Sequence, residues 1–234
     1  MARISRSLIN LQGTLGDLTI VNSQAYGRHV RARKGTHTKV ECNDSLKLNS
    51  GNALSVTSLA SVWQNALRSI ELYFVQPRLW EKIIGRMFAT RSSTVSTLLH
   101  SLEGLDINAA YPFERLLPNL PEIEWKTTAR NIIATMHCDS YPIFPTSLHA
   151  DSYFYTLHIF WLNETGIRCE TSSIETEWLP LKHEPLLFTL KLSKPSWAAH
   201  YTALLKLHAG TNNTDLPFLP AQGMKVIKCA EASR

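Results

Sequence analysis

Cysteine is scarce in this chain, and its spacing excludes the usual ways in which cysteine stabilises a fold. The 234 residues hold four cysteines with no CxxC pair among them: Cys42, Cys138, Cys169 and Cys229. Structural zinc sites commonly present their ligands as closely spaced pairs. We therefore expect free thiols or small core residues, no metal and no cofactor, with a disulfide between two C-terminal strands as the alternative.

Long apolar runs are missing as well. No stretch approaches the roughly 20 apolar residues of a membrane-spanning helix. A secretory signal needs an uninterrupted apolar run of roughly 7–15 residues, whereas the segment after Arg6 is broken by Asn10, Gln12 and Gly13. These absences predict no membrane span and a cytoplasmic protein.

The sequence also lacks the motifs of the common catalytic sites. It contains no GxSxG, no GxxxxGK[ST], no GxGxxG opening a helix and no HExxH. The densest group of titratable side chains flanks a proline-rich loop and consists of His137, Cys138, Asp139, His149 and Asp151. Three of them could converge on a metal, but histidines in strands and loops more often lie at the surface or make hydrogen bonds. We expect a protein that is not an enzyme, with an enzyme of unrecognised type as the alternative.

What the chain does have is an ordinary globular composition with an uneven charge. Hydrophobic residues make up 44% and charged residues 18% of the sequence, which argues against disorder. Residues 1–40 hold seven basic side chains against one acid, giving +6, so the remaining 17 basic and 18 acidic groups sum to −1. This asymmetry indicates a contact between residues 1–40 and an anionic partner. The alternative is a solvated arm without a partner.

The pattern within residues 8–40 predicts a β-ribbon, which would make the region 1–40 a basic N-terminal arm. An apolar strand is expected at 15–21, a loop at 22–25 and a cationic strand at 26–34 that ends at Gly35. Gly13 and Gly16 suit a turn or bulge at the start of the ribbon. A single hairpin is marginal in water, so the ribbon is expected to dock on its own domain, on another subunit or on a partner.

Residues 50–104 change to the three- and four-residue apolar spacing of helices. This spacing predicts a short bundle of about three helices whose apolar stripes form a core. The expected caps and breaks, in chain order, are Ser50 or Asn52, Pro77, Ser92 or Ser93, and Gly104.

From residue 105 to residue 234 short apolar segments alternate with loops rich in Pro, Asn and Gly. The expected strands are 105–108, 123–126, 131–138, 153–162, 167–171, 186–192, 201–208 and 225–230. Short strands separated by turn signals predict an antiparallel β-sandwich, of which the immunoglobulin-like arrangement is one form. Within 201–208 polar and apolar residues alternate, which predicts one face in the core and one in water. The fold class is therefore α+β.

Two segments resemble an uncharacterised family of Bacteroidota proteins. Residues 11–20, LQGTLGDLTI, are followed by the basic strand 28–35, RHVRARKG, and the family has a similar Gly-Thr-Leu-Gly-Asp-Leu-Thr segment, a loop and a basic strand ending in glycine. Residues 102–108, LEGLDIN, resemble the family's Leu-Glu-Gly-Phe-Asp-Phe-Asn junction after the helices. This chain has Ile20 where the family often has Phe. The resemblance supports the order of the three regions and implies no particular activity.

These features favour a structural or assembly subunit that forms a homo-oligomer, or joins a larger protein assembly, by adding its ribbon to a sheet edge. The residues expected to make the contact are Leu18, Ile20, Tyr26, Arg28, Arg31, Arg33 and Lys34, with turns at Gly13, Gly16 and Gly35. Nucleic-acid binding by the same arm is the alternative. A third hypothesis is carbohydrate binding by an aromatic outer face of the 153–162 strand.

Overall fold

The structure of the chain is a computed structural model. It describes residues 2–3, 13–15, 18–23, 27–32, 44–70, 78–108, 111–182, 185–216 and 221–232, and up to residue 50 it describes the backbone alone. The chain divides into two compact units, Met1–Leu48 and Asn49–Arg234. Each unit is described separately.

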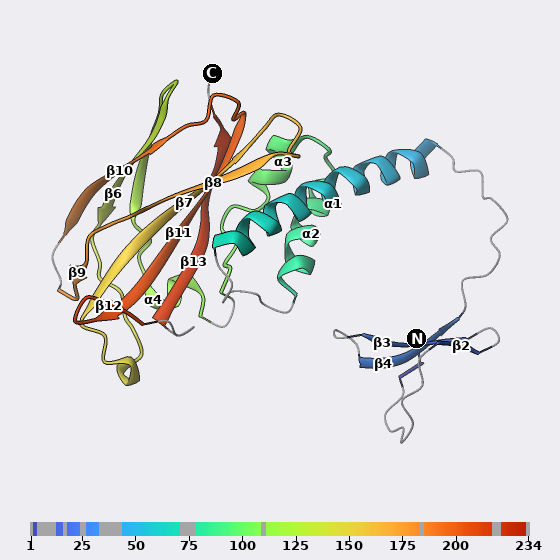
Figure 1. Ribbon diagram of the computed structural model, residues 1–234, viewed down its shortest axis with the longest axis horizontal. Coiled ribbons are helices and arrows are strands. Elements are labelled where there is room, and N and C mark those ends of the chain that lie inside the picture. Colours follow the sequence, from blue (N-terminus) through green and yellow to red (C-terminus); the bar gives the residue numbers. More distant parts are fainter. Residues whose placement is uncertain are drawn as a thin grey trace. The chain divides into compact units, whose positions relative to one another are not determined.

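The first unit contains a four-stranded antiparallel sheet with the strand order β1-β4-β3-β2 (Figure 1). The strands are β1 (Ala2–Arg3), β2 (Gly13–Leu15), β3 (Leu18–Ser23) and β4 (Gly27–Ala32). The β-branched run Thr19, Ile20 and Val21 suits the extended backbone of β3. The two six-residue strands are central in this sheet, and short strands lie at both edges.

The described helices precede the large sheets in the chain. They are α1 (Asp44–Ile70), α2 (Leu79–Ala89), α3 (Val95–His100) and α4 (Phe113–Leu116), with a 3-10 turn at Thr146–Leu148. The caps expected for the first helix are wrong, because α1 begins at Asp44 and both Ser50 and Asn52 lie inside it. Asn49 and Gly51 interrupt the apolar spacing there, which is why the pattern indicated a later start.

The other two helices of the predicted bundle also begin at residues that the pattern did not select. Arg78, with a φ of 76°, precedes α2, and the expected break at Pro77 lies outside the described residues. Thr94 is the N-cap residue of α3, in place of Ser92 or Ser93. The Oγ of Ser92 lies 3.1 Å from Oγ1 of Thr94, so the serine takes part in the turn before the helix.

Two antiparallel sheets make up most of the second unit. The smaller has the order β10-β6-β5 and the larger the order β12-β11-β7-β8, with β13 paired to β11 and β9 paired to β7. The strands are β5 (Glu122–Thr127), β6 (Asn131–Cys138), β7 (Ser152–Leu162), β8 (Cys169–Glu175), β9 (Leu179–Pro180), β10 (Leu186–Ser193), β11 (His200–Thr211), β12 (Thr214–Asp215) and β13 (Gln222–Glu231). The expected strand at 105–108 is wrong, since only an isolated bridge from Asp106 to Lys225 forms there.

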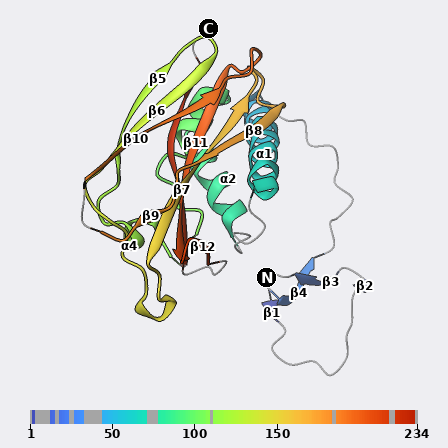
Figure 2. The ribbon, with the colours of Figure 1, turned by 60° about the vertical axis from the view of Figure 1, so that its left-hand side comes forward.

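The large sheet is the middle layer of three (Figures 1 and 2). On one face, Tyr155, Leu157 and Trp161 of β7 share a core with Ile132 and Met136 of the small sheet. On the other face, residues of β7, β11 and β13 share a core with the helices, among them Phe160, Leu162, Leu204, Met224 and Val226. Both faces of the middle layer are therefore covered, and the fold is α+β.

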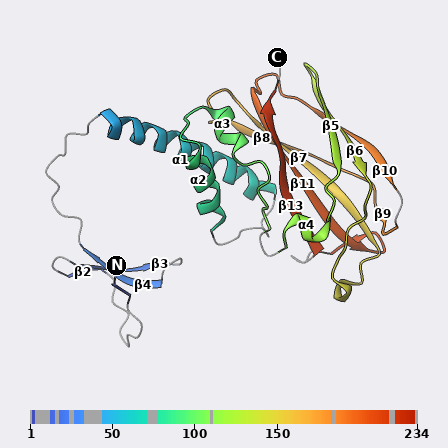
Figure 3. The same ribbon diagram turned by 180° about the vertical axis from the view of Figure 1, so that it is seen from behind.

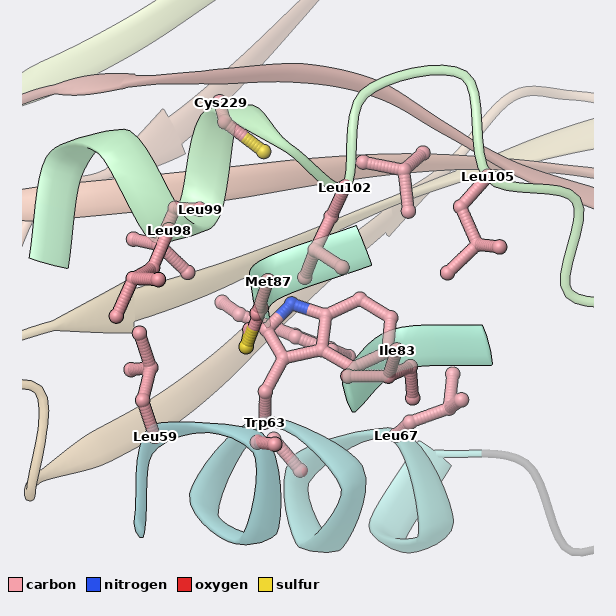
Figure 4. Packing of buried hydrophobic residues seen from close by; sticks show 14 of the residues in the cluster. Leu59, Trp63, Leu67, Ile83, Met87, Leu98, Leu99, Leu102, Leu105 and Cys229 are labelled. Atoms are coloured by element: carbon pink, nitrogen blue, oxygen red, sulfur yellow. The ribbon is translucent and has the colours of Figure 1, made fainter. Parts of the chain in front are cut away.

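Trp63 of α1 lies at the centre of the helical core (Figure 4). Its side chain is fully buried among residues of its own helix and of α2 and α3, including Leu67, Ile83, Met87 and Leu99. Its ring meets the ring of Phe160 edge-on, with the centroids 5.5 Å apart. The contact joins the helical layer to the large sheet.

The expectation that one face of 201–208 lies in water is wrong. Every residue from Tyr201 to Gly210 is buried, including Lys206 at 4% and His208 at 6% exposure. The helices cover this face around Leu204, while Asp215 lies beside His208. Polar side chains suggested water at these positions, but the additional layer withdraws them from solvent.

The two sheets approach each other on one side and separate on the other. Strand β10, one edge of the small sheet, passes close to β8 of the large sheet. On the opposite side β5 and β13 remain apart (Figure 3). The paired sheets therefore form a curled half-barrel with an open side between these two strands.

Candidate functional site

The structure places half of the predicted site residues on described strands. Gly13 lies in β2, Leu18 and Ile20 lie in β3, and Arg28 and Arg31 lie in β4. The others lie outside the described residues: Gly16, Tyr26, Arg33, Lys34 and Gly35.

The pairing of β3 with β4 places two apolar pairs on one face of the four-stranded sheet, together with Arg28, which is opposite Asn22. Ile20 is opposite Val30, and the next pair along, Thr19, is opposite Arg31. Leu18 is opposite Ala32, which again pairs apolar with apolar. Because adjacent residues of a strand belong to opposite faces, the register assigns the apolar pairs to one face and Arg31 to the other.

The edges of the two larger sheets differ in how far their backbones are already paired. On β13, the amides of Gly104 and Ile107 donate to the carbonyls of Val226 and Met224, both at 2.9 Å. Strand β5 is terminal in its sheet and, within the described part of the chain, pairs only with β6. A terminal strand carries a row of N–H and C=O groups directed away from its sheet, so β5 is an available edge.

A groove with a volume of about 350 Å³ lies beside β5, on the open side of the half-barrel. Its lining residues are Leu120, Pro121, Ile123, Trp125, Gly104, Leu205, Lys225, Val226 and Ile227. The Trp125 ring lies 6.1 Å from the ring of Tyr201, which belongs to the core between the sheets. The groove is therefore a mainly apolar extension of that core toward solvent.

Charge is arranged in alternation with the apolar residues along β5. Glu122, Glu124 and Lys126 are exposed, whereas Ile123 and Trp125 are half-buried. The buried Lys225 forms an ion pair with Glu114 of α4, which balances the cation in the groove wall. The site thus offers an apolar groove, an available backbone edge and an acidic outer surface beside it, a combination suited to an extended segment with apolar and basic residues in alternation.

A buried polar network lies on the opposite face of the large sheet. Oγ1 of Thr156 lies 3.1 Å from Nε2 of His208, whose Nδ1 lies 3.5 Å from a carboxylate oxygen of Asp215. The order hydroxyl, imidazole and carboxylate also occurs in hydrolase triads. Here Thr156 is only 2% exposed and the ring of His208 is stacked on Phe154 with centroids 4.1 Å apart. We interpret the network as structural, because a substrate cannot reach the hydroxyl.

His158 lies in the same face. Its Nδ1 is 2.6 Å from Oγ of Ser173 on β8, and its Nε2 lacks a hydrogen-bond partner in the part of the chain that the structure describes. Burial, together with the nearby Lys206 and His208, lowers the pKa of His158 from 6.5 to about 3. An imidazole with this pKa is neutral and too weak a base to activate the serine near neutral pH.

The titratable residues expected near 137–151 occupy different environments. Cys138 points into the core between the sheets, and burial raises its pKa to about 11. The Asp151 carboxylate accepts hydrogen bonds from the Ser152 hydroxyl and the Asn212 amide, while His149 is exposed. Among the described residues no group of three or more His, Cys, Asp or Glu side chains is placed to hold a metal ion.

The aromatic residues of 153–162 do not form an exposed surface. Tyr153, Tyr155, Phe160 and Trp161 are each at most 1% exposed, and Phe154 is 8% exposed. The outer aromatic face of the third hypothesis is therefore absent, because β7 is central in its sheet and covered on both sides. The hypothesis of carbohydrate binding is based on an exposed aromatic face, and the strand has none.

Comparison with known proteins identifies no family for this chain. A scan against protein-family models finds no match for this chain, and a search of curated proteins finds none. Within the residues that the structure describes, no helix is both long and apolar enough to cross a membrane.

Proposed function

We propose that the protein is a non-enzymatic assembly subunit that self-associates, or docks on a protein partner, through its N-terminal β-ribbon. The observation that carries the proposal is the small antiparallel sheet within the unit Met1–Leu48. Its two longest strands, β3 and β4, have six residues each. A hairpin of this size is marginal on its own in water, and the strands that flank it, β1 and β2, have only two and three residues, so pairing with a further strand or packing on a partner surface would stabilise it.

The location of the charge supports a protein contact for this segment. Residues 1–40 carry a net charge of +6 and the remainder of the chain carries −1. Attraction between the arm of one copy and acidic side chains on the body of the next, such as Glu122 and Glu124, would act locally against the repulsion between chains that each carry +5 overall. Electrostatic attraction of this kind raises the association rate and fixes the register of the contact.

The proposed mode of binding is β-strand addition. Backbone hydrogen bonds to a sheet edge would supply affinity, and alternate side chains would supply specificity. We also propose an immunoglobulin-like relationship for the two larger sheets, supported by their antiparallel strands and shared core. A cytoplasmic location is proposed from the free thiols of Cys138, Cys169 and Cys229, since reducing compartments keep thiols free.

Light scattering of the full-length chain and of a variant lacking residues 1–40 tests the function. The full-length protein is expected to form particles larger than one chain, and the deletion variant is expected to be monomeric with its far-UV circular dichroism retained. A full-length protein that is monomeric at all concentrations refutes the proposal. So does a deletion variant that assembles like the full-length chain.

Nucleic-acid binding is the second candidate, and the +6 charge of residues 1–40 favours it. Phosphate contacts would make the affinity fall steeply with salt concentration. A gel-shift titration at low and physiological salt distinguishes the two functions. Absence of binding at low salt eliminates this candidate and leaves the assembly function intact.

A further inference from the structure

We propose that β5 is the acceptor for the N-terminal ribbon, and that the ribbon which occupies it is β4 of a second copy of this chain. The inference rests on the proposed assembly function and names the surface that receives the arm. In this arrangement β4 of the second copy pairs with β5 and extends the sheet β10-β6-β5 by one strand. The apolar residues of β4 would then lie at the groove beside Ile123 and Trp125.

Polar and apolar residues alternate along both strands, β4 and β5. Along β5 the acidic residues Glu122 and Glu124 are exposed, and the half-buried Ile123 and Trp125 alternate with them and line the groove. Along β4, Val30 and Ala32 alternate with His29 and Arg31. Any pairing that brings Val30 and Ala32 to the groove therefore brings His29 and Arg31 to the acidic face, with Arg28 on the groove side near the start of the strand.

The same alternation determines which face of β4 can meet the groove. An antiparallel pairing with Val30 opposite Trp125 places Ala32 opposite Ile123 and Arg31 opposite Glu124. A slip of one residue would direct Arg31 into the apolar groove and Val30 toward solvent, since the side-chain period of a strand is two. Opposite charges directly across a strand pair stabilise the pairing, so charge and apolar contact favour the same face of β4, although this register also places His29 opposite Lys126.

The backbone edges of β4 and β5 match in length and can both be freed for pairing. Strands β4 and β5 both have six residues, so one can pair along the full length of the other. Among the described residues of the first unit, β1 covers the outer edge of β4 only at His29 and Val30. An incoming β5 edge needs to replace this two-residue pairing, whereas the edge of β13 is already bonded through Gly104 and Ile107.

Charge reversal in the full-length chain tests the assignment. Glu124→Arg opposes Arg31 with a like charge, and Arg31→Glu opposes Glu124 in the same way. Each single variant is expected to raise the dissociation constant of assembly by about tenfold or more, because attraction is replaced by repulsion. The double variant, Arg31→Glu with Glu124→Arg, is expected to recover most of the loss, as measured by light scattering across a concentration series.

Mixing the two single variants shows whether the contact is between copies. The Glu124→Arg chain retains an intact ribbon and the Arg31→Glu chain retains an intact acceptor, so the mixture is expected to associate when neither variant does alone. A ribbon bound to its own chain predicts no gain on mixing and overturns the assignment to a second copy. Glu175→Arg, an exposed acid on β8, is the matched control and is expected to assemble like the wild type.

The result separates failure of this assignment from failure of the proposed function. If residues 1–40 are required for assembly but Glu124→Arg assembles like the wild type with an unchanged thermal unfolding curve, the ribbon binds elsewhere and β5 is not the acceptor. If the double variant recovers nothing although both single variants weaken assembly, Arg31 and Glu124 are not partners. Either result overturns the inference and leaves the assembly function standing.

Discussion

The buried imidazole of His158 makes the stability of the fold depend on pH. The ring is 6% exposed, and its pKa is lowered to about 3 by burial and by the neighbouring cations. In the unfolded chain the same group titrates near its ordinary pKa of about 6.5. Below pH 6.5 the unfolded chain therefore binds a proton that the folded chain excludes, and the equilibrium moves toward unfolding. This contribution to stability is complete above pH 6.5 and is lost as the pH falls toward 3.

The magnitude follows from the size of the pKa difference. Each pH unit within the window lowers the free energy of unfolding by about 1.4 kcal/mol, so acidification from pH 6.5 to about 5 is expected to cost about 2 kcal/mol. Hydrogen bonds from Ser152 and Asn212 lower the pKa of Asp151 below 3.8. The contribution of this carboxylate is complete above pH 3.8 and is lost only below it, so the interval from pH 6.5 to 5 reports mainly on histidine.

Urea unfolding, followed by tryptophan fluorescence from pH 7 to pH 5 at constant ionic strength, measures the effect. The wild type is expected to lose about 2 kcal/mol over the acidic part of this range, and His158→Gln is expected to lose much less. A smaller slope remains in the variant because burial also lowers the pKa of His200. Thr135→Ala, which replaces a residue without a titratable group at a half-buried position of β6, is expected to keep the wild-type slope. An unchanged pH slope in His158→Gln would refute the reasoning.

Three further substitutions are expected to change stability, each measured by chemical denaturation. Trp63→Ala removes the fully buried ring that meets Phe160 and is expected to cost about 3–5 kcal/mol; a loss below about 1 kcal/mol contradicts the packing of the helices on the sheet. Gly210→Ala places a Cβ 2.1 Å from the Trp178 ring, which must then move, and is expected to cost about 1–3 kcal/mol. Gly85→Ala, in the interior of α2 with no atom within 4 Å of the added Cβ, is expected to stabilise the protein by about 0.5–1 kcal/mol; a destabilised variant would show that the position is more crowded than described.

Local patterns predicted the strands better than they predicted the layers. Strand β6 has the bounds expected from sequence, because its alternation of half-buried and buried residues is a local property. The second face of β11 was assigned to water because Thr202, Lys206 and His208 are polar. Their burial depends on layers from distant parts of the chain, and the alternation along one strand carries no information about such layers.

The candidate sites also depend on contacts between distant residues, which local sequence patterns do not show. The network of Thr156, His208 and Asp215 joins residues up to 59 positions apart (215 − 156), so no sequence motif could reveal it. The groove beside β5 likewise forms only because the sheets separate on that side, which brings Trp125 near Ile227. The alternation of Glu122, Ile123 and Glu124 is visible in the sequence, but it is common to many half-buried strands and does not show which of them is terminal.

A strand-addition contact has a donor and an acceptor, and the two are visible by different means. The donor carries its signal in the sequence, since the excess positive charge lies within residues 1–40 and Arg31 alternates with apolar neighbours there. The acceptor is defined by topology, since β5 becomes an edge only through the strand order of its sheet. Arg31→Glu therefore tests a conclusion drawn mainly from sequence, and Glu124→Arg tests one drawn mainly from structure. Because only a direct contact makes each change compensate for the other, recovery in the double variant requires both conclusions to hold together.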